Sequence, residues 1–216
     1  MSVKISELDT GDLVLFDTRF FYSKWIEYFT KSRYSHVGII LRKPTWLDEK
    51  LTDDLYLLES GGENFVDAET GKFRFGVQIA PFSKICDKYF NEGYGTIYVR
   101  KMLTLDLDRE SFYTNIKNAY LNVYDKPYDI NPSDWLNAYL DLDKDIESDS
   151  SLTDKYQKTC SFWCSALVSF MFVKTGLLDK QIPWTIISPS DFCYKFNRLK
   201  FINCVLDIDK ILENKL

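Results

Sequence analysis

The 216-residue sequence contains one histidine, His36, in the stretch SRYSHVGIIL at the start of an apolar run. Histidine is the side chain whose unperturbed pKa lies closest to neutrality, so the chemistry it would supply is proton transfer. A histidine beside apolar residues is also commonly a structural residue, and the pattern leaves both interpretations open. The role of His36 depends on the groups that the fold brings to its ring.

A carboxylate partner for this ring is predicted at Glu59. Residues 36–41 and 55–59 both read as strands. If they pair as an antiparallel hairpin centred between Leu47 and Asp48, the imidazole and the carboxylate stand directly opposite each other. Opposed residues of such a pair share a face, with Cβ atoms about 5 Å apart. The carboxylate would then orient the ring and stabilise its protonated form, unless the register slips by one residue.

A nucleophile is predicted in a buried helix that Thr159 would cap at its start and Gly176 at its end. Cys164 lies near the start of this helix, where the macrodipole and the unpaired N–H groups favour a thiolate. The same N–H groups could bind the oxyanion that forms when a carbonyl is attacked. Cys160, one turn earlier, is the alternative nucleophile, and a packing role is the alternative for both cysteines.

The strands and helices that the sequence predicts around these residues indicate an α+β fold. Residues 1–216 are taken as one domain. The acidic stretch 141–158 reads as a solvated loop or insertion. Strands are predicted over 13–16, 36–41, 55–59, 73–82, 95–102 and 199–208, and helices over 20–32, from 108 to before Pro127, and from 160 to 175.

Composition excludes several classes of function. Hydrophobic residues make up 45% and charged residues 27%, which is ordinary for a globular protein. The net charge of −5 argues against nucleic acid as the main partner. The longest apolar run, residues 162–173, is too short for a membrane span, which needs about 20 residues.

The cysteines and the first residues predict a reducing, cytoplasmic location. Five cysteines at irregular spacing do not form a disulfide framework, and the first residues lack the apolar core of a signal peptide. With one histidine and no CxxC pair, the ligand sets of a zinc site are missing. The sequence therefore predicts neither a metal nor an organic cofactor.

Taken in order, six pieces carry a resemblance: LDTGDLVLF, SRYSHVGII, an acid ending the next strand, KPYD, CSALVSFMF and SPSDF. Together they resemble the circularly permuted papain-fold hydrolases of the NlpC-like superfamily, close to the YiiX/YaeF-like group and more distantly lecithin retinol acyltransferase. The resemblance covers roughly residues 8–192. It implies a permuted papain-like fold in which a central antiparallel sheet packs on the cysteine-bearing helix. Ordinary papain-fold enzymes place the cysteine helix before the histidine strand, and here the order is histidine, acid, cysteine.

The resemblance assigns the catalytic roles residue by residue. The S-H-V-G core makes His36 the catalytic base, and the acidic third member of the triad matches Glu59. The C-S-x-L-V signature favours Cys164 over Cys160 as the nucleophile.

Three further residues, Tyr128, Ser35 and Ser165, are implied as substrate-binding by the motifs in which they lie. Tyr128 belongs to the family's Y-D pair before the cysteine segment, and the two serines adjoin the predicted base and nucleophile. The family's Gly-Asp pair before its first strand matches Gly11 and Asp12.

The function that follows is a thiol hydrolase acting on a peptide, amide, ester or thioester through an acyl-enzyme. The first alternative keeps the site for lipid acyl transfer or phospholipase-like hydrolysis, with peripheral membrane contact. The second is a non-catalytic binding module with an unreactive thiol. Four aromatic residues would line an acyl groove under the first alternative, or belong to the core: Phe20, Phe21, Trp25 and Phe29.

The origin of the chain is predicted from its composition and from the resemblance. The sequence is rich in Lys, Asn, Ile, Tyr and Phe, which hints at an AT-rich genome, and the resemblance includes viral members. A viral protein of the host cytoplasm or the virion is therefore one interpretation. The pattern predicts no oligomeric state.

Overall fold

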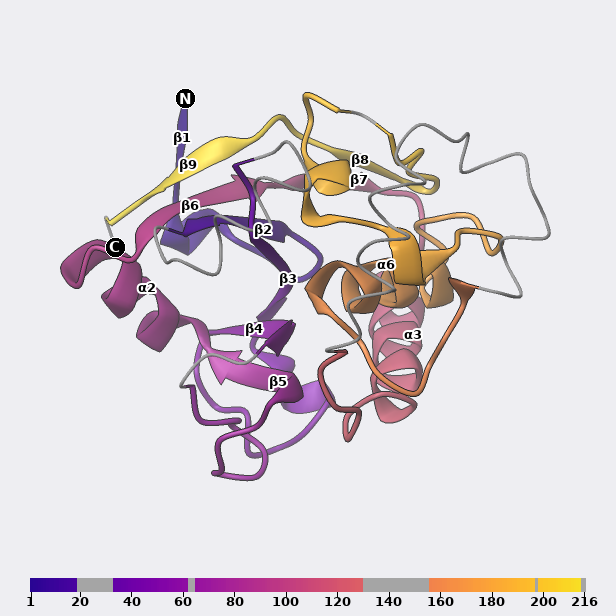
Figure 1. The fold of residues 1–216 in the computed structure, drawn as a ribbon, viewed down its shortest axis with the longest axis horizontal. Helices are drawn as coiled ribbons and strands as arrows, with labels where there is room; N and C mark the ends of the chain where they lie inside the picture. The colour runs from indigo at the N-terminus through magenta and orange to yellow at the C-terminus, as the bar shows by residue number, and fades with distance from the viewer. Residues whose placement is uncertain (19–32, 62–64, 130–155, 197, 215–216) are drawn as a thin grey trace.

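The computed structural model describes residues 1–18, 33–61, 65–129, 156–196 and 198–214. These residues form an α+β fold in which a large sheet carries helices on both faces (Figure 1). The described strands of this sheet follow the order β1-β9-β6-β2-β3-β4-β5, and all neighbours are antiparallel except β1 and β9.

The strands of the large sheet are β1 (Ser2–Lys4), β2 (Leu13–Thr18), β3 (His36–Arg42), β4 (Leu55–Gly61), β5 (Gly76–Pro81), β6 (Gly95–Arg100) and β9 (Lys210–Glu213). A second, two-stranded sheet pairs β7 (Met102–Leu105) with β8 (Cys204–Leu206). Within the described residues the named helices are α2 (Phe82–Asn91), α3 (Arg109–Leu121) and α6 (Cys164–Lys174), with 3-10 turns η1 (Ile5–Glu7), η2 (Pro44–Trp46), η3 (Trp184–Ile186) and η4 (Pro189–Phe192).

The period-2 alternation of the central strands divides their side chains between two apolar cores. From β3, Val37 and Ile39 join the core that α3 and α6 cover. Ile40 and its cross-strand partner Leu57 join the core that α2 covers on the opposite face. Figure 1 shows α2 on one side of the sheet and α3 with α6 on the other. Because both faces of the central strands are covered, the middle of β2 and β3 is a continuous run of buried residues without a polar side chain, over 13–16 and 37–41.

The cysteine-bearing helix α6 is buried along nine consecutive residues from its first, which agrees with its uniformly apolar sequence. Its start differs from the prediction, because the N-cap is Trp163 and not Thr159. The physical reason is the pairing of Phe162 with Tyr128 in a parallel β-bridge. That pairing holds the chain extended, so the helix begins only after it.

The ends of the second described helix agree with the prediction, whereas one predicted strand begins a few residues later. Asp108 caps α3 as expected, with its carboxylate accepting a hydrogen bond from the Ser111 N–H at 2.9 Å. The helix ends at Leu121, before Pro127 as predicted. The strand predicted from residue 73 begins at Gly76, and α2, which follows it, was not predicted.

Several predictions concern residues outside the described ranges. They are the helix over 20–32, the four acyl-groove aromatics within it, and most of the acidic stretch 141–158.

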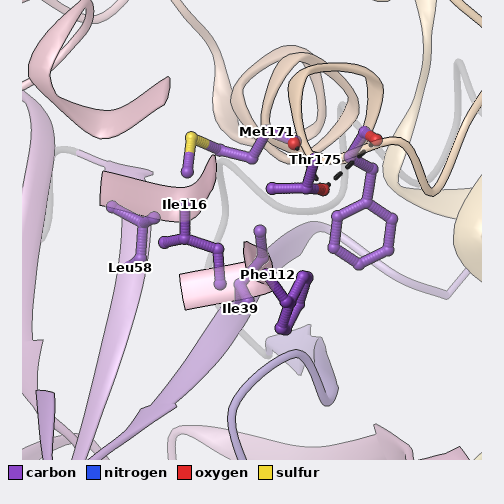
Figure 2. Close-up of a pocket in the computed structure, with 7 residues that line it drawn as sticks. Ile39, Leu58, Phe112, Ile116, Met171 and Thr175 are labelled. Atoms are coloured by element: carbon purple, nitrogen blue, oxygen red, sulfur yellow. Dashed lines mark hydrogen bonds between the residues drawn. The ribbon is translucent and has the colours of Figure 1, made fainter. Parts of the chain in front are cut away.

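A small cavity lies between the sheet and the helices α3 and α6 (Figure 2). Its volume is about 10 Å³, and the one polar side chain on its wall, Thr175, donates its hydroxyl to the Met171 carbonyl at 2.8 Å. A space of this size with no polar group turned toward it holds neither a substrate nor a stable water. It is a packing gap, lined by Ile39, Leu58, Phe112, Ile116, Met171, Phe172 and Thr175.

Candidate active site

His36 and Glu59 are brought into direct contact. The imidazole Nε2 lies 2.6 Å from the Glu59 Oε2, and the carboxylate is 2% exposed. The register that brings them together differs from the prediction by two residues. Ile39 pairs with Leu58, and continuing this register would put Glu59 opposite Gly38 instead of His36.

His36 and Glu59 still meet because the register differs from the predicted one by an even number of residues. A two-residue shift keeps every side chain on its predicted face, whereas a one-residue shift would reverse it. Diagonal neighbours lie about 7–8 Å apart at the backbone, which a glutamate and an imidazole together can span. The shift arises in the connection, since the last pair of the hairpin is Arg42 with Leu55 and its centre is one position later than assumed.

Gln78 is a member of this cluster that the sequence reasoning missed. It lies opposite Glu59 in the β4–β5 pairing, and its amide Nε2 donates to the Glu59 Oε1 at 2.8 Å. The side chain is fully buried, and its own Oε1 has no hydrogen-bond partner among the described residues. The sequence offered one signal for it, a glutamine between Val77 and Ile79 inside an apolar strand. A polar residue in a buried strand is an exception that indicates a specific partner.

The second neighbour of the imidazole is Cys164. Burial acts to lower the pKa of His36, but the charge of the Cys164 sulfur and a hydrogen bond with it act in the opposite direction. The hydrogen bond and charge of Glu59 add to this effect, so the pKa of the ring is raised well above its usual value. The protonated imidazole is therefore favoured between two acidic groups.

Cys164 is the first residue of α6 and is 4% exposed. No side chain at the N-cap position bonds to the helix start, so the first N–H groups keep the positive end of the macrodipole uncapped. Cys160 lies outside the helix, exposed, with its sulfur 3.8 Å from the Ser161 hydroxyl. All five cysteines of the chain are described, and none is in a disulfide.

Tyr128 lies beside the cysteine segment on a short extended stretch. On one side Phe162 donates its N–H to the Pro127 carbonyl at 3.0 Å. On the other side Tyr128 donates its N–H to the Phe75 carbonyl at 3.1 Å. Burial, and then the charges of Cys164, Asp129 and Glu59, raise the pKa of the phenol well above its usual value. The hydroxyl of Tyr128 is thus a neutral group close to the candidate nucleophile.

Gly76 allows this stretch to approach β5. Its φ is +151°, and a Cβ at this position would lie 2.4 Å from the Lys126 carbonyl oxygen and 2.8 Å from the Pro127 Cα. A residue with a side chain would push the Pro127–Tyr128 backbone away from the sheet. The glycine is therefore part of how the fold holds Tyr128 near Cys164.

The two predicted serines make backbone contacts. The Ser35 hydroxyl donates to the Phe16 carbonyl at 3.2 Å, and the Ser165 hydroxyl donates to the Ile187 carbonyl at 2.6 Å. Both side chains are buried. Their protons are engaged in holding β3 to β2 and α6 to the following loop, and a direct role in substrate binding stays a prediction.

The Gly11–Asp12 pair lies at the far end of β2 from His36, where it closes a turn. Asp12 accepts hydrogen bonds from the Met102 N–H at 2.7 Å and from the Asp9 N–H at 2.8 Å. Burial raises the pKa of this carboxyl to about 6. Its contacts tie the start of β2 to the start of β7.

Two kinds of feature are absent from the described ranges. No group of three or more His, Cys, Asp or Glu side chains gathers there as metal ligands would. Among the helices in the same ranges, none has the length and apolar content that crossing a bilayer requires.

Comparison with known proteins adds distant likeness to solved structures. No family model and no curated protein matches the chain. Among solved structures, the chain is similar to the crystal structure of the metalloprotein yiiX from Escherichia coli O157:H7. The TM-score is 0.45 at 17% identity, over 78% of this chain and 67% of that chain. A likeness of this degree neither identifies a family nor transfers an activity.

Proposed function

We propose that this chain is a cysteine-dependent hydrolase that cleaves an amide, ester or thioester through an acyl-enzyme. Cys164 is the nucleophile, His36 is the general base and then the general acid, and Glu59 orients the imidazole. The observation that carries the proposal is the position of the imidazole between two acidic groups. Glu59 bonds to its Nε2 at 2.6 Å, and the charge of the Cys164 sulfur and a hydrogen bond with it also raise the pKa of the imidazole.

The first half of the reaction uses the thiolate–imidazolium pair. His36 takes the proton of Cys164, and the thiolate attacks the substrate carbonyl to form a C–S bond. With Nε2 bonded to Glu59, Nδ1 is the ring nitrogen available to the sulfur. When the tetrahedral intermediate collapses, the bond to the leaving group breaks and the leaving group takes the imidazolium proton.

The second half returns the free enzyme. A water molecule gives a proton to His36 and attacks the thioester carbonyl, and the C–S bond breaks to release a carboxylic acid. In both halves the negative oxygen of the intermediate would lie near the uncapped N–H groups at the start of α6. Gln78 supports the arrangement by holding the second oxygen of Glu59.

The same proposal includes the family suggested by the sequence, the circularly permuted papain-fold hydrolases of the NlpC-like superfamily. It is supported by the chain order histidine, glutamate, cysteine and by the packing of the cysteine helix α6 on the antiparallel strands β3 and β4. A circular permutation changes the order of the strands and the helix along the chain but not their positions in the fold. The three side chains can therefore meet in the permuted order as they do in the ordinary one.

The test compares two cysteine variants, Cys164→Ala and Cys160→Ala, with p-nitrophenyl acetate as the substrate. Removal of the nucleophile should lower kcat/KM by about 10³-fold or more, whereas removal of the exposed cysteine four residues earlier should leave it unchanged. Mass spectrometry of the rapidly quenched wild-type protein should find the acetyl group on Cys164. Full turnover by Cys164→Ala, or an acetyl group on Cys160 alone, would refute the proposal.

A further inference from the structure

Two consecutive residues of β4 contact the two parts of the candidate site. Glu59 bonds to His36 at 2.6 Å. The side chain of Ser60 takes the opposite face of the strand, and its hydroxyl donates to the Phe162 carbonyl at 2.6 Å. Phe162 lies in the core that α6 covers, two residues before Cys164. One strand therefore holds the imidazole through one side chain and the segment that leads to the sulfur through the next.

The contact of Ser60 closes four extended segments into a curled arrangement. Three successive pairings connect the first segment to the last, namely Gly61 with Gly76, Gly76 with Pro127, and Tyr128 with Phe162. In a flat sheet the first and fourth segments would lie about 14 Å apart, at about 4.8 Å for each step. A serine hydroxyl bonded to a carbonyl spans about half of that distance between the two backbones. The segments therefore curl, and the Ser60–Phe162 hydrogen bond joins the first to the last.

Phe162 is packed against the helix that Cys164 begins. Its ring centroid is 5.3 Å from that of Phe170, and both side chains are buried. The carbonyl of the next residue, Trp163, accepts the Leu167 N–H at 3.1 Å and so belongs to the first turn of the helix. Phe162 and the start of α6 therefore move together. Whatever holds the Phe162 carbonyl also sets where the Cys164 sulfur lies.

The Phe162 carbonyl has a second donor, the Asp129 N–H, at 3.2 Å. Loss of the serine hydroxyl therefore leaves this carbonyl hydrogen-bonded, and the fold tolerates the change. The remaining hold comes through residues 126–129, which are attached to β5 because the Val77 N–H donates to the Lys126 carbonyl at 3.0 Å. Small displacements add along successive pairings, so this route fixes the start of α6 less exactly than a direct hydrogen bond to β4.

We propose, resting on the hydrolase function above, that Ser60 is a positioning residue that holds the Cys164 sulfur against the His36 imidazole through the Phe162 carbonyl. Ser60 is fully buried, so water does not compete for its hydroxyl. The hydroxyl takes no part in the bond changes of the reaction. Its loss lets the start of α6 move away from β4, which weakens the contact between the sulfur and the imidazole.

The test uses the one histidine of the chain, because its NMR titration reports His36 alone. Cys164 and Glu59 both raise the pKa of this imidazole. In Ser60→Ala the sulfur contributes less, and the midpoint of the titration should fall by about 0.5 pH. The same substitution in a Cys164→Ala background should leave the midpoint unchanged, because the sulfur through which Ser60 acts is gone.

Turnover of p-nitrophenyl acetate measures the consequence for the reaction. Ser60→Ala should lower kcat/KM about tenfold, and Ser60→Thr, which restores the hydroxyl, should stay within about twofold of the wild type. The matched control is Thr175→Val. Thr175 is also buried and donates its hydroxyl to a backbone carbonyl, that of Met171 at 2.8 Å, but it lies at the opposite end of α6. Its substitution should change neither kcat/KM nor the midpoint.

The outcomes separate the positioning role from the hydrolase. A wild-type midpoint in Ser60→Ala overturns the positioning role. A fall that persists in the Cys164→Ala background also overturns it, since Ser60 would then act through Glu59, and so does an equal fall in Thr175→Val. Acetate turnover by Cys164→Ala at the wild-type rate overturns the hydrolase, and the NMR comparison still decides the role of Ser60. If circular dichroism shows Ser60→Ala to be unfolded, Ser60→Cys, a weak donor of similar size, takes the same tests.

Discussion

Two buried carboxylates, Glu59 and Asp191, are each 2% exposed and each fully engaged, yet their partners differ in kind. Asp191 accepts hydrogen bonds from the Ser188 N–H and hydroxyl, both at 2.8 Å, and its other oxygen lies 3.2 Å from the Arg198 guanidinium. Glu59 bonds to an imidazole and an amide. Burial alone therefore does not distinguish the two.

The difference lies in whether the partner can change its charge. Backbone N–H groups, a hydroxyl and a guanidinium keep their charge at every physiological pH, so the contacts of Asp191 close a turn and hold Arg198 without exchanging a proton. The imidazole that Glu59 holds can gain and lose a proton, and it is coupled to Cys164. A carboxylate with a titratable partner is the one to examine for chemistry.

The largest effect is expected from removing the titratable partner. His36→Ala should lower kcat/KM by about 10³-fold, because the thiol then lacks both its base and its cationic partner. The alkylation rate of Cys164 by iodoacetamide at pH 7, followed by mass spectrometry, should fall in parallel. An unchanged alkylation rate would mean that the imidazole does not activate the sulfur. Glu59 would then be a structural carboxylate like Asp191.

The next effect concerns the structural carboxylate. Asp191→Ala should lower the free energy of unfolding by about 2–3 kcal/mol, because Arg198 loses its partner and the Ser188 donors are left unpaired. Urea unfolding measures the change. The pH dependence of the remaining activity should match the wild type, and a displaced alkaline limb would show that Asp191 also acts on the site.

For Glu59→Gln we expect a smaller loss of rate than for His36→Ala, together with a change in the pH dependence of kcat/KM. Glu59 raises the pKa of His36, so its loss lowers that pKa. The imidazolium is present below its pKa and is lost as the pH rises, so the alkaline limb of kcat/KM should move to lower pH. We expect about a 10- to 100-fold loss at the optimum as well. A fall in rate without movement of the limb would assign Glu59 a purely structural role.

The smallest effect is expected for Gln78→Leu, which keeps the volume but removes the amide donor. The Glu59 Oε1 loses its hydrogen bond, so the carboxylate is held less well and kcat/KM should fall about fivefold. The movement of the alkaline limb should have the same sign as in Glu59→Gln and be smaller. Steady-state kinetics over a pH series measures both, and movement in the opposite direction would exclude Gln78 as a positioning residue.

The sequence reasoning identified the members of the His36–Glu59 contact but placed their register two residues away from the structure. Alternation of apolar side chains is a local property and sets which face each residue takes. The register depends on the connection between β3 and β4, where η2 and the following turn decide how the two strands meet. An even error preserved the contact, and an odd one would have removed it.

Other residues needed the assembled fold. Gln78 joins the site only because β5 pairs with β4 in a register that puts it opposite Glu59. Helix α6 begins at Cys164, later than predicted, because Phe162 pairs with Tyr128, which is far away along the chain. Neither pairing has a signature in the local sequence, since each depends on a neighbouring strand.

By itself, the sequence determined the chemical types: one imidazole, a glutamate at the end of an apolar strand, and a cysteine in an apolar helix segment. It also determined the period-2 pattern that assigns each strand residue to a face, because that pattern follows from backbone geometry alone. Only the tertiary structure decided that the imidazole meets both Glu59 and Cys164 and that Gln78 holds the second oxygen of Glu59. The physical reason is that contacts between distant segments depend on the packing of the sheet and helix, which no single segment specifies.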